Sequence, residues 1–156
     1  MAVKDQLKAI VGNANVLDSP EIIESYSRDY SLAAPRRFTC VVRPRDTRDV
    51  QRIIKLANRE KFAVVPRSSG VHFYGNALPK MGGVVLDFQN MKAIKEIDEE
   101  NLLAHIEVGV TWDQFQNEVL AKGYRSVIPL LPHAQRSVVA DWLEREQPVV
   151  QVHEYS

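Results

Sequence analysis

The sequence predicts a mixed α+β fold, in which a strand–helix–strand parallel unit lies beside an antiparallel meander and helices flank both. Three observations predict it. Apolar runs at 40–42 and 62–65 enclose a segment with helical periodicity, which is typical of a parallel crossover unit. After residue 83 the hydrophobic period changes from 3.6 to 2, which indicates successive strands. A loop rich in small residues joins these two parts.

The composition bounds the kind of protein. With 156 residues, of which 45% are hydrophobic, the chain suits one compact domain or two small lobes. Twenty basic and twenty acidic residues give zero net charge, which argues against a nucleic-acid partner, since such binders need a basic excess. No apolar run approaches the roughly 20 residues of a membrane span, and the first residues lack the apolar core of a signal peptide. Cys40 is the only cysteine, so no internal disulfide can form, and a soluble cytoplasmic protein is expected.

Residues 1–36 are expected to form an N-terminal helical segment. The first helix has an apolar face formed by Leu7, Ile10 and Val11. Gly12 can end that helix. The run 19–21 then supplies a serine N-cap, a proline at the first helical position and a first-turn acid, so a second helix starts there.

The central unit begins with a short apolar strand at 40–42. Asp46 or Thr47 can cap the helix that follows. The apolar stripe of this helix is formed by Val50, Ile53, Ile54 and Ala57. The second strand, at 62–65, runs parallel to the first, because a helical crossover of this length returns the chain in the same direction with a right-handed turn.

The second half of the chain is expected to start with strands. The antiparallel meander has three of them, at 83–88, 93–98 and 102–108. Thr111 and Gln114 then form a capping box for a helix that runs through residue 122 and stops at Gly123. The buried face of this helix is expected to contain Trp112, Phe115, Val119 and Leu120. One more short helix is expected at 137–146.

The loop that follows the second central strand is the most informative segment. It leaves the carboxyl end of a parallel strand, the edge of such sheets where ligands collect. Its small residues let backbone N–H groups converge on one anion, and Ser68, Ser69 and Arg67 add side-chain donors. These features predict a phosphate or pyrophosphate ligand. An ordinary surface loop with glycine turns explains the spacing equally well.

Two familiar phosphate loops are excluded. A dinucleotide fingerprint or a Walker loop must open a helix, because the helix N-terminus holds the phosphate. Here Gly70 and Gly75 are followed by Pro79 and a strand, which leaves no room for a helix, and no Gly-Lys-Ser/Thr run is present. What remains is a nest of N–H groups between two strands.

Three stretches follow one another in a recognisable order. The first is 41–44 with 49–50, the second runs from 64 to Gly75 and on to 82–87, and the third is 108–112 with Phe115. Together they resemble the FAD-binding domain of the vanillyl-alcohol oxidase and p-cresol methylhydroxylase (PCMH-type) family. Within this family, the sequence is most similar to the FAD-linked glycolate oxidase and D-lactate dehydrogenase proteins. The resemblance covers about residues 38–130 and implies a PCMH-type FAD-binding lobe.

The resemblance implies that backbone N–H groups of residues 67–71 wrap the FAD pyrophosphate. Residues 109–110 are then expected near the adenosine half, and Pro132 near the flavin. The implied cofactor-binding residues are Pro66, Arg67, Ser68, Ser69, Gly70, Val71, His72, Gly75, Gly109, Val110 and Pro132. Some relatives attach flavin through a histidine at the position that Val71 occupies here, so noncovalent FAD is expected.

The resemblance also implies an organisation. Residues 1–36 precede the first lobe of the FAD-binding domain at 37–132, and 133–156 form a C-terminal helix and tail that begin a truncated second lobe. The whole enzyme is expected to oxidise a substrate such as a 2-hydroxy acid, bound through a domain missing here. The chain alone is expected to be incomplete, and no residue in it is assigned as the catalytic base.

Other interpretations stay open. His105 and Glu107 lie on one face of a predicted strand, where a solvated face is favoured over an acid–base pair. His72 is expected to contact solvent or a phosphate, Cys40 to pack in the core, and no metal site is expected. The alternatives are a non-catalytic docking module or a subunit of a split flavoenzyme, with a partner chain or homo-oligomer, and a small nucleotide-binding protein.

Overall fold

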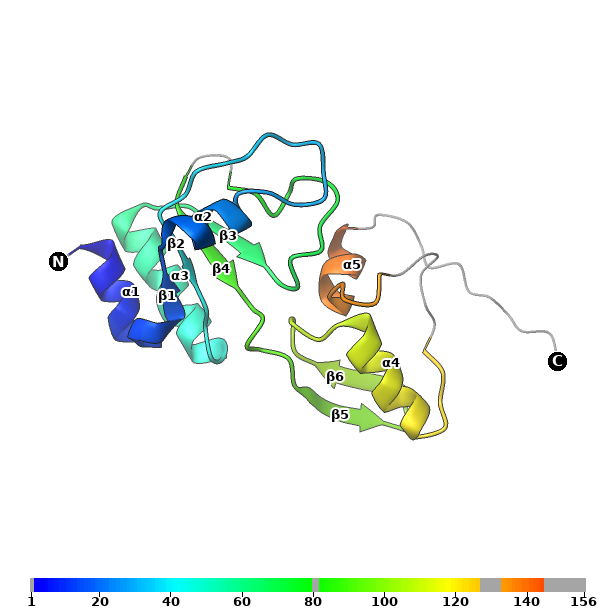
Figure 1. The fold of residues 1–156 in the computed structure, drawn as a ribbon. Helices are drawn as coiled ribbons and strands as arrows, with labels where there is room; N and C mark the ends of the chain where they lie inside the picture. The colour runs from blue at the N-terminus through cyan, green and yellow to red at the C-terminus, as the bar shows by residue number, and fades with distance from the viewer. Residues whose placement is uncertain (1, 80–81, 127–132, 145–156) are drawn as a thin grey trace.

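The computed structural model describes residues 2–79, 82–126 and 133–144. It contains a four-stranded sheet and, apart from it, a two-stranded hairpin (Figure 1). The sheet consists of β1 (Val16–Leu17), β2 (Cys40–Val42), β3 (Val64–Arg67) and β4 (Val84–Asp87), in the spatial order β1-β2-β4-β3. The hairpin consists of β5 (Ile94–Asp98) and β6 (Leu103–Ile106). The mixed α+β class that the sequence predicts is therefore confirmed.

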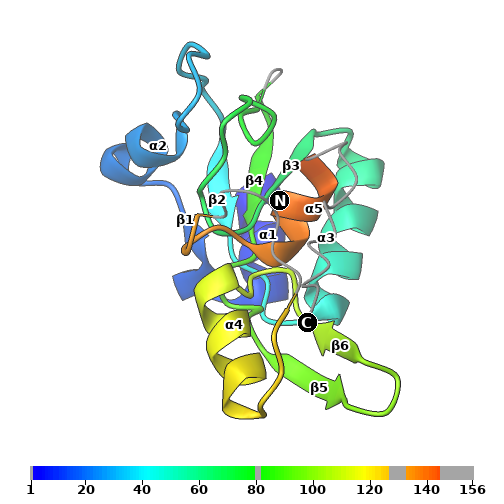
Figure 2. The ribbon, with the colours of Figure 1, turned by 90° about the vertical axis from the view of Figure 1, so that its right-hand side faces the viewer.

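Five α-helices accompany these strands in the described residues. They are α1 (Val3–Val11), α2 (Pro20–Tyr26), α3 (Thr47–Glu60), α4 (Trp112–Ala121) and α5 (Val138–Glu144). In Figures 1 and 2, α1 and α3 accompany the four-stranded sheet, whereas α4 accompanies the hairpin. Helix α5 lies between these two units. No described helix is both long enough and apolar enough to cross a membrane.

The parallel unit contains one more strand than the sequence predicts. β2 and β3 are parallel to β4, which lies between them and pairs through Val85 with both Val41 and Val65. The prediction that 83–88 opens the antiparallel meander is therefore wrong. All four residues of β4 are buried, and such continuous burial is typical of a parallel strand that is covered on both faces.

The N-terminal segment is not wholly helical. After α1 ends at Gly12, whose φ is +89°, a 3₁₀ turn (Asn13–Asn15) leads into β1, which pairs antiparallel with β2. Helix α2 starts as predicted, because the Ser19 hydroxyl accepts a hydrogen bond from the amide of Ile22. Two residues of β1 are too short a run to show a period, which is why the strand escapes sequence analysis.

The core lies where α1 and α3 meet the sheet. Leu7 of α1, Ile53 of α3 and the strand residue Cys40 are fully buried in it. Asp46 caps α3, since its Oδ1 accepts from the amide of Asp49 at 2.9 Å. The predicted stripe of α3 is wrong at Ile54, which is 40% exposed, and Leu56 is buried instead. The contact face of α3 is thus turned toward Leu56.

The predicted capping box and the predicted buried face of α4 are each only partly confirmed. Thr111 Oγ1 accepts from the amide of Gln114 at 3.3 Å, but the Gln114 side chain donates to Lys92 O instead of returning to its own helix start. Trp112 is buried, whereas Leu120 is 54% exposed, so the prediction that Leu120 belongs to the buried face is wrong. The buried residues of the helix are Trp112 in its first turn and Val119 near its end.

Helix α5 begins one residue later than predicted, and 145–146 fall outside the described residues. The Ser137 hydroxyl accepts from the amide of Ala140 at 3.2 Å and donates to Val108 O at 2.6 Å. The amide of Val138 donates to Val110 O at 3.0 Å. These bonds place the start of α5 against the segment between β6 and α4.

Candidate functional site

Charged residues gather where the three parallel strands end. Asp87, the last residue of β4, is 2% exposed and accepts on Oδ2 from Tyr26 Oη at 2.6 Å and from Arg43 Nε at 3.0 Å. Burial, and next the hydrogen bond to Asp87, raise the pKa of Tyr26. The network ties the end of α2 to the carboxyl ends of β2 and β4, and the loop leaves the neighbouring strand β3.

Arg67, the last residue of β3, turns back toward α2. Its guanidinium carbon lies 4.5 Å from the ring centroid of Tyr26, and Nη1 donates to Tyr26 O at 3.1 Å. Burial lowers the pKa of Arg67. Gly70 has a φ of +79°, and a Cβ there would lie 3.2 Å from Nη2 of Arg67. The arginine thus lies close under the loop.

A cavity of about 280 Å³ lies between this loop and α5. On the loop side it is lined by Pro66, Arg67, Ser68 and His72. On the α5 side its lining includes Val139, Leu143 and Glu144. A concave, largely apolar space with a few polar groups is typical of a small-molecule site.

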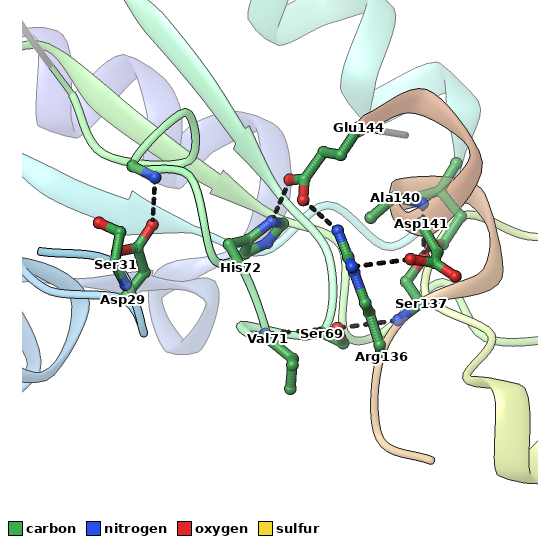
Figure 3. Close-up of polar contacts among 12 residues, drawn as sticks. Asp29, Ser31, Ser69, Val71, His72, Arg136, Ser137, Ala140, Asp141 and Glu144 are labelled. Atoms are coloured by element: carbon green, nitrogen blue, oxygen red, sulfur yellow. Dashed lines mark hydrogen bonds and ion pairs between the residues drawn. The ribbon is translucent and has the colours of Figure 1, made fainter. Parts of the chain in front are cut away.

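One wall of the cavity carries a buried polar cluster (Figure 3). His72 Nδ1 lies 2.5 Å from Glu144 Oε1, and Glu144 Oε2 also pairs with Arg136 Nη2. Arg136, which is 1% exposed, reaches Asp141 Oδ1 through Nη1 at 2.7 Å. Asp141 Oδ2 in turn accepts from Trp112 Nε1 at 2.9 Å. The cluster joins the loop, α4 and α5.

Sequence analysis missed the C-terminal half of this cluster. Asp141 and Glu144 lie in the short helix that the sequence predicts at 137–146, and no role is predicted for Arg136. The available signal was the spacing of Asp141 and Glu144, which places two acids on one face of α5. The expected solvent contact of His72 is wrong, because its exposed fraction is 3% and its Nδ1 pairs with Glu144. The expected contact with a phosphate stays a prediction.

The two loop serines have different environments. Ser69 Oγ accepts from the amide of Ser137 at 2.9 Å and from that of Val71 at 3.5 Å, so it links the loop to the start of α5. Ser68 Oγ is buried and has no hydrogen-bond partner in the described part of the chain, and the same is true of His72 Nε2. Both residues line the cavity.

Only some of the backbone amides in the loop donate hydrogen bonds within the described residues. Within residues 2–79, 82–126 and 133–144, no hydrogen bond engages the N–H groups of Ser68, Ser69 or Gly70. The amide of Gly75, in contrast, donates to Asp29 Oδ2 at 3.0 Å. The first part of the loop therefore keeps the donors that a phosphate nest needs.

Gly109 and Val110 are not among the residues that line the cavity. The amide of Gly109 donates to Met91 O at 2.8 Å, and that of Val110 to Glu107 O at 3.1 Å. A Cβ at Gly109 would lie 2.5 Å from Phe88 O, so close packing of two backbones requires the glycine. Pro132 lies outside the described residues.

The His105 and Glu107 pair does not form. His105 is exposed on β6, opposite Glu96, whereas Glu107 Oε2 accepts from the amide of Ala93 at 3.0 Å. Glu107 Oε1 lies 3.4 Å from Lys95 Nζ. His105 is therefore solvated as the sequence favours, whereas the Glu107 side chain is 17% exposed and lies just beyond β6.

Comparison with known proteins gives a consistent match. A protein-family model that describes an FAD-binding domain matches residues 38–139, which is more than half of the chain. Glycolate oxidase subunit GlcD of Bacillus subtilis is 36% identical over 121 residues, which are 78% of this chain and 26% of the relative. D-2-hydroxyglutarate dehydrogenase of Stutzerimonas stutzeri is 30% identical over 122 residues, with the same two coverages.

A solved structure shares the fold. A crystal structure of p-cresol methylhydroxylase with substrate bound superposes with a TM-score of 0.81 and 26% sequence identity. The match covers 92% of this chain and 29% of that one. The chain thus spans about a quarter of the length of the curated relatives that it matches. The domain match, these relatives and the shared fold lead to one conclusion: the chain belongs to the FAD-binding domain family.

Proposed function

We propose that this chain is the first lobe of the FAD-binding domain of a flavin-dependent oxidoreductase that acts on a 2-hydroxy acid. The names of the relatives, a glycolate oxidase subunit and a D-2-hydroxyglutarate dehydrogenase, support that substrate class. Bound FAD would accept a hydride from the substrate and pass electrons to a second acceptor, so the residues of this chain bind and orient the cofactor. The catalytic base belongs to the part of the enzyme outside this sequence.

The cavity beside the loop is the observation that supports the proposal most. Two residues that line it, Ser68 and His72, each contain a buried polar atom (Oγ and Nε2) that has no partner in the described residues, and buried polar atoms are rarely left so. The unengaged amides of 68–70 lie in the same loop. Such a donor set fits an oxygen-rich group, and the diphosphate of FAD is one.

In this proposal the amides of 68–70 hold the diphosphate. Arg67 contributes positive charge from beneath the loop, since its Nη1 is engaged by Tyr26 O. The amides of Gly109 and Val110 donate hydrogen bonds within the protein. These two residues would therefore contact the adenosine half of FAD by van der Waals packing and not through their amides. Pro132 is proposed to approach the flavin. The FAD is held noncovalently, because Val71 occupies the attachment position and His72 Nδ1 faces Glu144.

The organisation of the chain is part of the proposal. The first lobe comprises 37–132, preceded by 1–36, and 133–156 start a second lobe. The substrate would be bound through a further domain. A cytoplasmic location is supported by the single, buried and unpaired Cys40. Cell fractionation with an antibody against this chain would test the location.

Cofactor titration tests the proposal directly. The purified chain is titrated with FAD, FMN, ADP and ATP, and binding is followed by flavin fluorescence and calorimetry. FAD and ADP are expected to bind, FMN more weakly, and acid precipitation is expected to release the flavin. Binding of ATP without FAD would favour a small nucleotide-binding protein, and absence of any binding would contradict the proposal.

A second candidate is a docking module or one subunit of a split flavoenzyme. Trp142 and Leu143 of α5 are 50% and 81% exposed, and Leu143 also lines the cavity. Exposed large apolar side chains next to a binding site suggest a surface that another chain covers. Sedimentation of the purified chain distinguishes the cases, because a monomer that binds FAD without any partner would argue against docking.

A further inference from the structure

The hairpin of β5 and β6 has two edges, and only one of them is protected against pairing with a further strand. Among the described residues each of these strands pairs only with the other, so each leaves a row of backbone N–H and C=O groups unpaired on its outer side. Strand β5 carries Lys95, Glu96 and Asp98, and its register is shifted between Ile94 and Glu96. Charged side chains and bulges of this kind prevent pairing at the edges of natural sheets.

Strand β6 has neither form of protection. Its residues, Leu103–Ile106, include no Asp, Glu, Lys, Arg or Pro, and no extra residue of β6 interrupts its pairing with β5. Leu103 is 65% exposed, and Ala104 and His105 are also exposed. An exposed strand edge without charges is a template on which another strand can pair. The outer edge of β6 is therefore a candidate interaction surface.

A hydrogen bond just beyond β6 shows which of its backbone groups face outward. The amide of Glu107 donates to Ala93 O at 2.9 Å, on the side of β5. Because the backbone groups of successive residues in a strand point to opposite sides, those of His105 also face β5, and those of Ala104 and Ile106 face away from it. Outside the hairpin itself, no hydrogen bond engages the backbone of these two residues in the described part of the chain.

We infer that the outer edge of β6 pairs antiparallel with β6 of a second copy of this chain. The contact is isologous, because both copies contribute the same strand, so it closes as a two-fold dimer. It joins the two hairpins into one four-stranded antiparallel sheet and removes the unpaired edge of β6 from each copy.

The register of this pairing follows from the direction of the backbone groups. Hydrogen bonds form only where outward-facing residues of both strands meet, as Ala104 of one copy does with Ile106 of the other. His105 then lies opposite its own copy, on the two-fold axis. The alternative register, centred on Ala104, requires Leu102 in the ladder, and the φ of +55° at Leu102 is not that of an extended strand.

Two features favour a second copy of this chain over a different partner. The residues of β6 include no Asp, Glu, Lys or Arg, so two copies of the strand bring none of these charges together across the axis. The whole chain has zero net charge, and proteins without net charge lack the long-range repulsion that keeps identical copies apart.

Sedimentation of the whole chain over a range of concentrations tests the dimer. A ladder of so few residues buries less than the roughly 1,000 Å² of a stable interface, so dimers should become abundant only between about 1 μM and about 1 mM. Ala104→Lys places two lysines beside the axis and should raise the Kd of the dimer about tenfold or more. Ala121→Lys, at an exposed position of α4, is the matched control and should leave the Kd unchanged. A chain that is monomeric throughout, or an equal effect of both variants, would overturn the inference.

Cross-linking tests the position of the two-fold axis. Directly opposite residues that share no hydrogen bonds have Cα atoms about 4.5 Å apart, which lies within the range of about 4.4–6.8 Å for a disulfide. Mild oxidation should therefore link His105→Cys into a covalent dimer, whereas His133→Cys, at another exposed histidine, should stay monomeric. The natural Cys40 is buried and does not compete. A dimer that forms in the wild type but does not cross-link through position 105 would contradict pairing along β6.

Hydrogen exchange of the wild type identifies other occupants of the edge without any substitution. The amides of Ala104 and Ile106 should become protected only at the concentrations at which the dimer forms. Protection of both amides in the monomer would show that another part of the same chain covers the edge, and fast exchange in the dimer would show that the copies meet elsewhere. Either result overturns the inference and leaves the proposed FAD site untouched, because cofactor titration tests that site separately.

Discussion

Tyr26 Oη donates a 2.6 Å hydrogen bond to Oδ2 of Asp87, across 61 positions of the chain. The same oxygen accepts from Arg43 Nε at 3.0 Å, and Arg43 Nη2 donates to Tyr26 Oη at 3.0 Å. The three side chains close a triangle at the end of the parallel sheet. The ring of Tyr26 also lies under the guanidinium of Arg67. The triangle and Arg67 therefore meet at the base of the loop that follows β3.

Replacing Asp87 should destabilise the fold. Asp87→Asn removes a buried charge that two donors share, and such losses cost about 2–4 kcal/mol in the free energy of unfolding. Urea denaturation measures the change. Asp113→Asn, at an exposed position of α4, is the control and should cost about 0.5 kcal/mol or less. Equal effects of the two variants would contradict the role of the triangle.

The neighbouring serines should respond in opposite ways. Ser69→Ala removes the acceptor of the Ser137 amide and should lower the free energy of unfolding by about 1 kcal/mol. Ser68→Ala removes a buried hydroxyl without a partner in the described residues, so stability should stay the same or rise by up to about 1 kcal/mol. FAD affinity should nevertheless fall in Ser68→Ala. Thermal unfolding and FAD titration of both variants check this, and a destabilised Ser68→Ala would show that its hydroxyl is engaged.

Gly109 is expected to matter for packing. In Gly109→Ala the new Cβ would lie 2.5 Å from Phe88 O and 2.7 Å from Met91 O, so the backbone must shift. Overpacking of this kind costs about 2–3 kcal/mol. Gly123→Ala meets no atom within 4 Å but has a φ of +82°, and should cost about 1 kcal/mol from conformation alone. Chemical denaturation ranks the two variants, and a milder Gly109→Ala would contradict the close approach.

The thiol of Cys40 should make stability depend on alkaline pH. Burial raises its pKa from 9.0 to about 11, so the folded state keeps the thiol neutral where the unfolded chain forms a thiolate. The resulting stability is complete below pH 9 and is lost as the pH rises toward 11. The stability difference between wild type and Cys40→Ala should shrink over that window. Iodoacetamide should label Cys40 at pH 8 only after urea is added, and rapid labelling of the folded protein would contradict the burial.

Local signals in the sequence predicted what local interactions control. The caps at Ser19 and Thr111 were predicted correctly, and Asp46 is one of the two predicted candidates for the cap of α3. Each of these side chains bonds an amide three positions away, which is a local interaction. The loop at the carboxyl end of β3 was also placed correctly, because the strands on either side of it show their own apolar runs. The buried faces of α3 and α4 were not predicted correctly in full. Ile54 and Leu120 are exposed, although they fit an apolar stripe as well as the buried residues do.

The sequence by itself determined the helices, the principal strands, the position of the loop that follows β3 and, through three ordered stretches, the family. Only the tertiary structure decided that β4 lies between β2 and β3, that β1 joins the sheet, and that His72 meets Glu144 across 72 positions. Periodicity and caps report on residues three or four positions apart, whereas strand order and buried ion pairs depend on which surfaces pack together. The contact between the loop and α5 is a product of that packing, and no local pattern encodes it.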